Sequence, residues 1–500
     1  MKQHRLKEVR HDSTLRRKSF SGNAFCILEE KGMAELKMDT VVERLTSYTT
    51  SLNYEDIPPE VIHQGKRLLV DTLGCALGGY TSEPSRIARE EARDIRSTQT
   101  ATVLWSGDKT SVDLATFANG IMMRYLDYND FNQSAHVKDG GHPSDAFAAV
   151  LSPAELAKRD GKTTLLGVVL AWEIMGRLAN AAVIRSRGFD YPTNIAIAGA
   201  CAAARMFGLS REQTAHAIGL TATANVGLGA TRYGDVAMWK GCAAANGCRN
   251  AVFAARMAAK GMTGPLEVFE GRSGFIKALT EDGRYDLEES FGGNGTPFLI
   301  MESSIKNYPC GSVAQTAVDC ALAIRPKLSS IANIEQINIR TFGSMLGGVM
   351  VNIMADGLDK WHPENRETAD HSMPYCVGVA FMYGGIEVRH FGNQYLHNPE
   401  LLNLIQKINI EVADECVQVY PEQRLNIVEV VTRSGERFEE RLGYHKGHPK
   451  NPLTDLELEK KFRSLAEGLL PERQTNIVLD ALWNLDQFDD FGKVIRMMQV

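Results

Sequence analysis

The chain has 500 residues, of which 44% are hydrophobic and 23% are charged, values typical of globular proteins. Acidic residues outnumber basic residues by 61 to 55, a net charge of −6, which argues against a dedicated nucleic-acid binder. No stretch of about 18 uncharged apolar residues occurs, and the best candidate, 165–184, contains Glu173 and Arg177. The composition therefore excludes a membrane bundle, a collagen-like chain and a disordered chain, and the length suggests about two to four compact units.

Nine cysteines are scattered from Cys26 to Cys416 without a CxxC pair. An odd, scattered set in a long chain indicates reduced intracellular thiols rather than a disulfide framework. We therefore expect a cytoplasmic protein. No cysteine spacing suits a zinc site or an iron–sulfur cluster, so the sequence predicts neither a metal nor another cofactor.

Residues 1–38 are basic and lack the apolar segment of a secretory signal, so we expect a disordered extension. The alternatives are translation from Met33 or Met38 and a transit peptide, which Glu8 and Asp12 argue against. From there to residue 285 the periodicity predicts helices almost throughout. A helix begins at Pro59 and ends at Gly78-Gly79, and others cover 165–183, 195–207, 211–220 and 243–260. These segments are rich in Ala and Gly, which allow close helix packing, so residues 39–285 predict a compact helical domain.

Residues 286–446 have a different pattern. Alternating residues predict strands at 337–340 and 408–412, and a hairpin with a Gly-containing turn joins 425–432 to 436–442. Helices are expected at 314–324 and 375–383 between them. After Gly447 the chain is helical again, with a capping box at Thr454–Glu457. We therefore expect a mainly α fold, in which residues 39–285 and 447–500 form one helical domain and 286–446 form an inserted α+β lid.

Two candidate catalytic residues lie between residues 126 and 145. Asp127 and Asp130 follow a helix expected over 116–125, and His142 precedes a Pro at the start of the next helix. A neutral imidazole at such a position can transfer protons near pH 7. The alternative is that Ser144 or Asp145 caps the helix and His142 is an ordinary loop residue.

Three further segments carry charge beside Gly or Pro. Arg232 and Lys240 flank a glycine-containing loop, and Lys240 is either an anion ligand or a solvated charge at a helix end. Lys306 and Ser312 border a turn whose backbone N–H groups suit a carboxylate, although an ordinary helix start has the same pattern. The last segment is 366–375, where Arg366 and His371 are candidates for binding substrate carboxylates. The alternative is a cluster that caps the following apolar helix.

Read together, these segments resemble the MmgE/PrpD family. The matching stretches are 69–74, 126–130, 142–145, 238–246, 261–265, 369–375 and 452–455, in the expected order. The resemblance implies a helical domain with an α+β lid, a homodimer, and lyase activity on small polycarboxylates. From the charge balance and the lack of a long apolar stretch we expect no nucleic-acid or membrane partner.

The resemblance also implies that Asp127, His142 and Lys240 are the catalytic residues. Several positions depart from the family pattern: Phe131 replaces a frequent Thr, the loop from Asp130 to His142 is longer than usual, and Gly311 replaces a His of the decarboxylase members. Leu346 falls near a Tyr of those members. These departures favour a 2-methylcitrate-type dehydratase of propionate catabolism over a decarboxylase.

Three hypotheses follow. The first is a lyase that dehydrates a 2-hydroxy-tricarboxylate such as 2-methylcitrate by metal-free acid–base catalysis. The second is a decarboxylase, isomerase or epimerase that acts on a related polycarboxylate. The third is a non-catalytic helical dimer that binds a carboxylate metabolite. In every case Asp127, His142 and Lys240 are expected to converge, although 113 positions separate the first from the last (240 − 127).

Overall fold

The computed structural model describes residues 37–133, 136–233, 236–346 and 349–499, and the chain from Met38 onward forms one compact unit. The extension expected over residues 1–38 lies almost entirely outside this described part. Helices dominate, as predicted, and two separate hydrophobic cores organise them. None of the described helices is both long enough and apolar enough to cross a bilayer.

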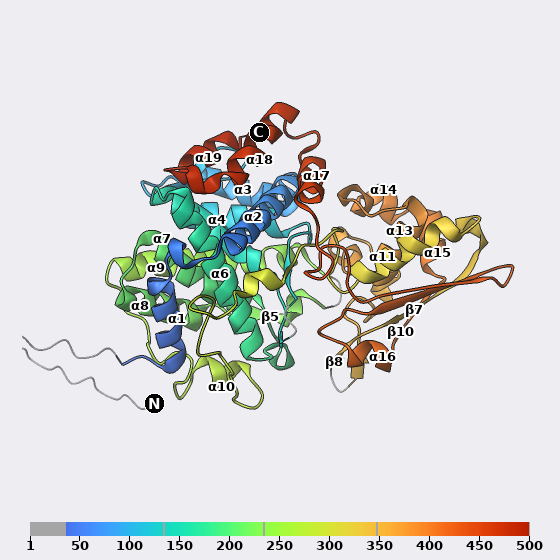
Figure 1. The fold of residues 1–500 in the computed structure, drawn as a ribbon, viewed down its shortest axis with the longest axis horizontal. Helices are drawn as coiled ribbons and strands as arrows, with labels where there is room; N and C mark the ends of the chain where they lie inside the picture. The colour runs from blue at the N-terminus through green and yellow to red at the C-terminus, as the bar shows by residue number, and fades with distance from the viewer. Residues whose placement is uncertain (1–36, 134–135, 234–235, 347–348, 500) are drawn as a thin grey trace, which may run out of the picture. The chain divides into compact units, whose positions relative to one another are not determined.

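The first core is built from helices near both ends of the chain (Figure 1). The helices of the N-terminal part are α1 (Thr40–Ser51), α2 (Pro59–Gly79), α3 (Glu83–Asp94), α4 (Val112–Arg124), α5 (Ala148–Leu156), α6 (Gly161–Ala181), α7 (Pro192–Phe207), α8 (Arg211–Ala224), α9 (Ala243–Ala259) and α10 (Phe275–Leu279). Those of the C-terminal part are α17 (Asp455–Ala466), α18 (Glu472–Trp483) and α19 (Phe491–Met497).

Short antiparallel strand pairs accompany these helices, and the sequence pattern did not predict them. They are β1 (Thr100–Thr102) with β2 (Lys109–Ser111), β3 (Phe131–Asn132) with β6 (Ser303–Ser304), and β4 (Phe189–Asp190) with β5 (Gly227–Leu228). Strands of two or three residues are too short to show an alternating pattern. The pairing of β3 with β6 matters for function because it joins segments far apart in the chain.

The start and end of α2 follow from its sequence. Pro59 occupies the first turn, where a missing N–H costs nothing, and the helix ends at Gly79 as predicted. The structure gives this glycine a second role. A Cβ on Gly79 would lie 2.4 Å from the carbonyl oxygen of Met122 in α4, so only glycine allows α2 and α4 to approach so closely.

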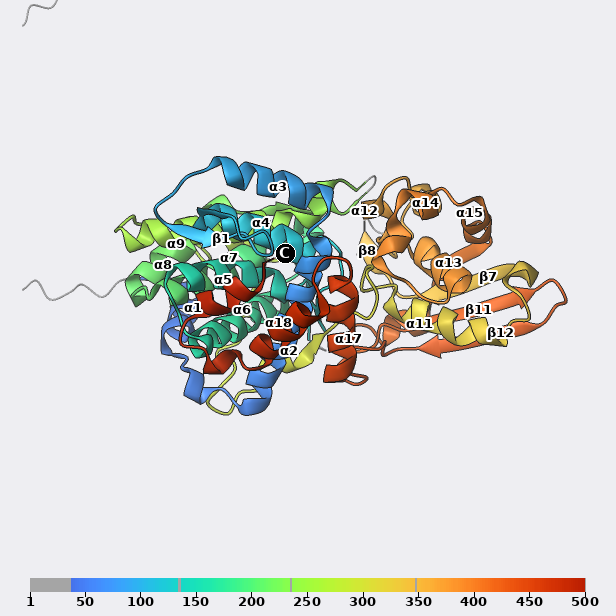
Figure 2. The same cartoon turned by 90° about the horizontal axis from the view of Figure 1, so that it is seen from above.

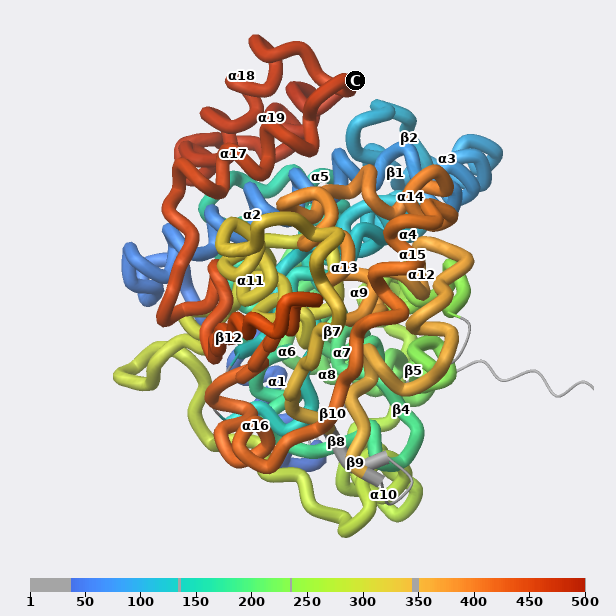
Figure 3. Tube along the Cα trace, turned by 90° about the vertical axis from the view of Figure 1, so that its right-hand side faces the viewer, coloured from blue at the N-terminus to red at the C-terminus, as the bar shows by residue number. Residues whose placement is uncertain are grey.

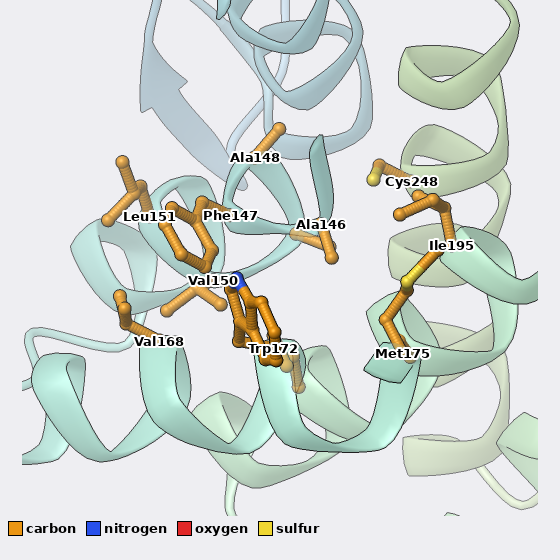
Figure 4. Packing of buried hydrophobic residues seen from close by; sticks show 14 of the residues in the cluster. Ala146, Phe147, Ala148, Val150, Leu151, Val168, Trp172, Met175, Ile195 and Cys248 are labelled. Atoms are coloured by element: carbon orange, nitrogen blue, oxygen red, sulfur yellow. The ribbon is translucent and has the colours of Figure 1, made fainter. Parts of the chain in front are cut away.

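Trp172 of α6 anchors the middle of the first core. Phe147, Val150 and Val168 surround its indole ring (Figure 4). The indole N–H points out of this apolar group and donates to Asp130 Oδ2 at 2.6 Å. A buried tryptophan usually finds such a polar partner, and here the partner lies beside the candidate site.

The second core lies between a four-stranded sheet and its helices (Figures 2 and 3). The strands are β7 (Ile334–Thr341), β10 (Ile408–Val412), β11 (Asn426–Thr432) and β12 (Arg437–Leu442), in the order β10-β7-β11-β12. β10 runs parallel to β7, and β11 is antiparallel to both of its neighbours. The helices are α11 (Gln315–Ile324), α12 (Arg366–Ala369), α13 (Met373–Tyr383), α14 (Asn393–Leu396), α15 (Pro399–Ile405) and α16 (Asp414–Gln418). A separate hairpin pairs β8 (Ser344–Leu346) with β9 (Val349–Val351).

The chain passes between the two cores twice. The first core extends to Ile305 and resumes at Leu453, whereas the second begins at Tyr308. The segment 287–305 therefore packs with the helical core, although the sequence placed its change of pattern at 286. The domain limits 39–285, 286–446 and 447–500 stay a prediction.

The C-terminal helices return to the N-terminal ones. Thr454 caps α17 in the predicted capping box, and α17 packs against α2 (Figure 1). The two helices are also joined by a buried ion pair of 2.6 Å between Lys461 and Asp71. Lys461 Nζ donates further to the carbonyl oxygens of Tyr128 and Lys306, so the C-terminal helix supports two segments of the candidate site.

Candidate active site

Asp127 follows the end of α4 in a left-handed backbone conformation, with a φ of 50°, which is uncommon for a residue other than glycine. Its buried Oδ1 lies 2.7 Å from Arg124 Nη1 and 2.6 Å from Lys306 Nζ. Burial opposes ionisation, but Arg124 and Lys306 outweigh it and hold the pKa of Asp127 well below its usual range. Asp127 is therefore a buried carboxylate shared by two cations.

Lys306 reaches Asp127 because β6 pairs with β3. Asp127 lies four residues before β3 and Lys306 lies two residues after β6, so the pairing joins segments that are 179 positions apart. Lys306 Nζ also donates to the backbone carbonyl of Asp127 at 2.8 Å. Burial lowers the pKa of Lys306, and Asp127 opposes this effect.

His142 has one ring nitrogen committed and the other available. Nδ1 lies 2.6 Å from the backbone carbonyl oxygen of Asp130. Because a carbonyl only accepts, Nδ1 carries the hydrogen and Nε2 carries the lone pair. Nε2 lies 3.6 Å from Asp127 Oδ1. Burial, with Arg124 and Lys306 nearby, holds the pKa of His142 well below 6.5, so the imidazole is neutral at pH 7.

Lys240 lies in a turn just before α9 and is buried rather than solvated. Its ammonium group pairs with Asp370 and donates to the carbonyl oxygen of Glu367 at 3.2 Å. The third neighbour is His371 Nδ1, at 3.0 Å. The ammonium thus contacts a carboxylate, a carbonyl oxygen and an imidazole ring. Burial lowers the pKa of Lys240 from its ordinary 10.5, although Asp370 opposes the shift.

His371 connects Lys240 to Asp127. Its Nδ1 lies 2.9 Å from Asp370 Oδ1 and 3.3 Å from Asp127 Oδ2. Burial and the neighbouring Lys240 lower the pKa of His371 to about 4, so this imidazole is also neutral at pH 7. The capping alternative considered from the sequence applies to the next residue, since Ser372 caps α13.

Asp130 supports His142 from behind. Its backbone carbonyl orients the imidazole, and its side chain accepts hydrogen bonds from Trp172 Nε1 at 2.6 Å and from Ser144 N at 3.2 Å. Burial raises the pKa of Asp130 to about 7 despite these two donors. Asp130 therefore faces Trp172, whereas Asp127 faces the cations.

The structure brings together Asp127, His142 and Lys240, as expected. Asp127 is central: His142 lies beside its Oδ1, and His371, which contacts Lys240, lies beside its Oδ2. Lys306 belongs to the same group. The geometry thus agrees with the expected convergence, while the catalytic roles of these residues stay a prediction.

Three other predicted residues lie outside this group. Arg232 pairs with Asp190 at 2.7 Å. Ser312 accepts from Arg424 Nη1 at 3.3 Å. Arg366, expected to hold a substrate carboxylate, instead directs its guanidinium to the carbonyl oxygens of Leu126 and Val388, at 3.4 and 3.3 Å. Its position between the rings of Tyr125 and Phe391 explains this orientation.

Arg124 and the groups that hold it were not predicted from the sequence. Arg124 Nε donates to Tyr191 Oη at 3.0 Å, and this hydroxyl donates to Asp145 Oδ2 at 2.8 Å. Asp145 also accepts from Asn129 Nδ2 at 2.8 Å, so it does not cap the helix as the alternative reading proposed. Arg124 ends a helix that is otherwise apolar on most sides, and a lone charge there was the available signal.

Three side chains of the group could in principle bind a metal ion: Asp127, Asp370 and His371 offer ligand atoms within 4.8 Å of one another. However, Lys306 and Arg124 already pair with Asp127, and Lys240 pairs with Asp370. A divalent cation would have to displace or deprotonate these groups, because like charges repel strongly in a buried site. The donor set therefore does not fit a resident metal.

This arrangement suits acid–base chemistry on an anionic substrate. It combines a neutral imidazole with an open Nε2, a buried ammonium with a lowered pKa, and fixed cations around one carboxylate. In addition, Arg124 Nη2 is buried and has no hydrogen-bond partner among the described residues. A buried donor without a partner is costly unless a ligand satisfies it, and a substrate carboxylate oxygen would do so.

Comparisons with known proteins agree with these features. The chain is 24% identical to a cis-aconitate decarboxylase of Homo sapiens over 93% of this chain and 95% of the relative. It is 26% identical to a mitochondrial 2-methylcitrate dehydratase of Yarrowia lipolytica, over 89% and 87% of the two chains. A 2-methylcitrate dehydratase of Escherichia coli O157:H7 is also 26% identical, over 86% and 91%.

The relatives are named as dehydratases and decarboxylases, which are lyases, so the chain is an enzyme of a lyase-like family. A non-catalytic binding role, the third hypothesis from the sequence, does not fit these relatives. The model of the MmgE/PrpD N-terminal domain matches residues 43–288, and that of the MmgE/PrpD C-terminal domain matches residues 308–485. With both domains matched in order along most of its length, the chain belongs to the MmgE/PrpD family.

Proposed function

We propose that this protein is a hydro-lyase that dehydrates a 2-hydroxy-tricarboxylate, 2-methylcitrate or a citrate-like acid, to an unsaturated acid without a metal. One observation carries the proposal: a neutral base and a protonated acid face the two oxygens of one carboxylate. His142 Nε2 lies by Asp127 Oδ1, and the Lys240–His371 pair lies by Asp127 Oδ2. A dehydration needs both, since one group removes a proton from carbon and another protonates the departing hydroxyl.

His142 is the proposed base. Its Nε2 lone pair takes the proton from the carbon next to a substrate carboxylate, and the electron pair left on carbon forms the new double bond. The Asp130 carbonyl fixes the productive tautomer by accepting from Nδ1. Asp127 Oδ1, at 3.6 Å from Nε2, stabilises the imidazolium that results. The carbanion develops only as this proton is removed, so at neutral pH the reaction needs a base and a stabilised charge at this place.

Lys240 is the proposed acid. Its ammonium donates a proton to the substrate hydroxyl, the carbon–oxygen bond breaks, and water leaves. Because burial lowers the pKa of Lys240, the ammonium is a stronger acid than an exposed lysine. Asp370 and the carbonyl of Glu367 keep Nζ in place, and the His371 ring packs beside it, with Nδ1 at 3.0 Å.

The substrate carboxylate beside the reacting carbon needs cations of its own. Lys306 and Arg124 both border Asp127, and Nη2 of Arg124 is the buried donor without a partner in the described part of the chain. We place the carboxylate against these two groups, where they stabilise the charge that moves onto its oxygens during proton removal.

Gly311 supports dehydration over decarboxylation. By resemblance, it stands where decarboxylase members have a His, and it offers no side chain to protonate carbon. A Cβ at Gly311 would lie 2.5 Å from Sδ of the buried Met354. Its N–H donates to the carbonyl oxygen of Asp370 at 2.8 Å. The backbone at this position therefore braces the Lys240 pair, and Met354 fills the space where a larger side chain would lie.

We also propose a homodimer in the cytoplasm. Support for a dimer comes from exposed apolar side chains around α9: Leu228, Trp239 and Phe253 are 56%, 49% and 51% exposed. Exposed apolar side chains of this kind can mark a protein contact. Sedimentation of the purified protein tests this proposal, and Phe253→Lys should shift the protein toward monomer. A wild-type protein that sediments as a monomer would contradict it.

The experiment that tests the function is a screen of purified protein against 2-methylcitrate, citrate and cis-aconitate. Products are identified by NMR, and released carbon dioxide is trapped in parallel. We expect an unsaturated tricarboxylate from a hydroxy-acid and no gas. Faster formation of carbon dioxide from cis-aconitate would establish the decarboxylase reading instead.

A further inference from the structure

The charges of the group around Asp127 already balance without a substrate. Three cations, Arg124, Lys240 and Lys306, face three carboxylates. The carboxylates are Asp127, Asp145 and Asp370. A tricarboxylate brings up to three further negative charges into this buried region. Burying an unpaired carboxylate is costly, so binding needs an additional cation that is not already neutralised.

Arg424 is such a cation. Its side chain is buried, with the residue 6% exposed, and no carboxylate forms an ion pair with it in the described part of the chain. Nε donates to Gln133 Oε1 at 2.7 Å, and Nη1 donates to Ser312 Oγ at 3.3 Å. Both partners are neutral. The guanidinium also lies over the rings of Phe131 and Tyr420, at 4.7 and 5.8 Å from their centroids.

Neutral partners do not repay the burial of a guanidinium as a carboxylate does. Burial accordingly lowers the pKa of Arg424, Tyr420 opposes this shift, and Arg185 adds to it. Within the described ranges Arg366 also lacks a carboxylate partner, but two backbone carbonyls hold its terminal nitrogens. The hydrogen bonds of Arg424 in the described part of the chain leave from Nε and Nη1, so Nη2 is not committed there to a protein acceptor.

Arg424 touches both segments that form the catalytic group. Phe131 and Gln133 continue the segment that carries Asp127 and Asp130. Ser312 lies in the turn that follows Lys306, next to Gly311, whose N–H holds the carbonyl of Asp370. The guanidinium therefore lies where these two segments meet. Phe131, whose ring it covers, is the residue next to Asp130 in the chain.

We propose that Arg424, with the Ser312 hydroxyl, forms a carboxylate subsite that binds the substrate carboxylate remote from the reacting carbon. The subsite rests on the proposed function, since it assigns a second position to the same polycarboxylate. Its planar guanidinium presents paired N–H donors that match two carboxylate oxygens. Arg424 thereby makes the enzyme select tricarboxylates over dicarboxylates.

The test uses two unreactive acids that differ by one carboxylate, tricarballylate (propane-1,2,3-tricarboxylate) and glutarate. Neither has a hydroxyl to lose, so calorimetric binding is independent of turnover. We expect wild-type protein to prefer tricarballylate, and Arg424→Met to weaken tricarballylate binding by at least about 10-fold while glutarate binding changes little. Arg205→Met is the matched control, because Arg205 has no carboxylate partner among the described residues and donates to the carbonyls of Thr50 and Leu52. It should leave both affinities unchanged.

Several outcomes overturn the subsite. Arg424→Met that weakens both acids equally, or neither, would show that Arg424 does not recognise the additional carboxylate. If Arg424→Met does not fold, Arg424→Lys and Ser312→Ala decide: each should reduce the preference for tricarballylate partially, and an unchanged preference in both refutes the proposal. Selective binding without any dehydration would refute the proposed reaction alone. Dehydration with an unaltered preference in Arg424→Met would refute the subsite alone.

Discussion

Asp127→Asn tests whether the buried charges depend on one another as the geometry indicates. The amide has nearly the same shape as the carboxylate, so the substitution changes charge and little else. Lys306 Nζ would keep the backbone carbonyl of Asp127, at 2.8 Å, but lose its anion. Breaking a buried ion pair by removing one partner typically costs about 3–5 kcal/mol. We expect the free energy of unfolding to fall by that amount, a large fraction of the roughly 5–15 kcal/mol of a typical domain.

The assay is urea unfolding followed by circular dichroism. Lys306→Met in the Asp127→Asn background removes the orphaned ammonium, so the double variant should recover at least about 1 kcal/mol relative to the single one. Glu173→Gln is the comparison, because it breaks the buried pair with Arg177. The other contacts of Glu173 are hydrogen bonds from the backbone N–H groups of Gly292 and Leu299, and none is with Asp127 in the described part of the chain. This variant should lose stability but retain activity in the folded fraction. A loss below about 1 kcal/mol for Asp127→Asn, or additive effects in the double variant, would refute the reasoning.

Three further predictions concern catalysis. His142→Ala and Lys240→Ala should each lower kcat/KM by at least about 100-fold. Their melting temperatures should change little compared with that of Asp127→Asn. A loss of kcat/KM below about 10-fold would show that the residue does not have its proposed role. The pKa of His142 lies well below 6.5 and that of Lys240 lies below 10.5. The value of kcat/KM should therefore stay level from about pH 8 to about pH 6 and fall on the alkaline side before pH 10.5. A protonation step near 6.5 in the pH profile would contradict the buried neutral imidazole. Dialysis against a chelator should leave activity unchanged, because Lys240, Lys306 and Arg124 neutralise the carboxylates that a metal would need, and activity restored by added iron or zinc would reverse this conclusion.

The sequence predicted the longer elements well, for reasons the structure makes explicit. Pro59 and Thr454 mark the starts of α2 and α17 because proline and a capping box satisfy a helix start locally. The alternation of buried Ile337 and Ile339 gave β7 its strand pattern. The pairing of β3 with β6 gave no such signal, because two-residue strands depend on contacts between distant segments rather than on local pattern.

The candidate site was partly predictable for a similar reason. His142 and Lys240 stand beside Pro or Gly in loops, where a charged or titratable residue is conspicuous. Arg124 was missed because it ends an apolar helix and resembles an ordinary C-terminal charge. Arg366 was assigned to the substrate because spacing cannot reveal that the rings of Tyr125 and Phe391 turn its guanidinium toward backbone carbonyls.

The central claim is that this chain removes water from a hydroxy-tricarboxylate with His142 as base. The most direct measurement is NMR of the product formed from 2-methylcitrate or citrate deuterated at the carbon that loses its proton, with a carbon dioxide trap alongside. We predict an unsaturated tricarboxylate, a slower reaction of the deuterated acid, no trapped gas, and loss of the reaction in His142→Ala. Itaconate and carbon dioxide from cis-aconitate, at a rate above that of any dehydration, would contradict the claim.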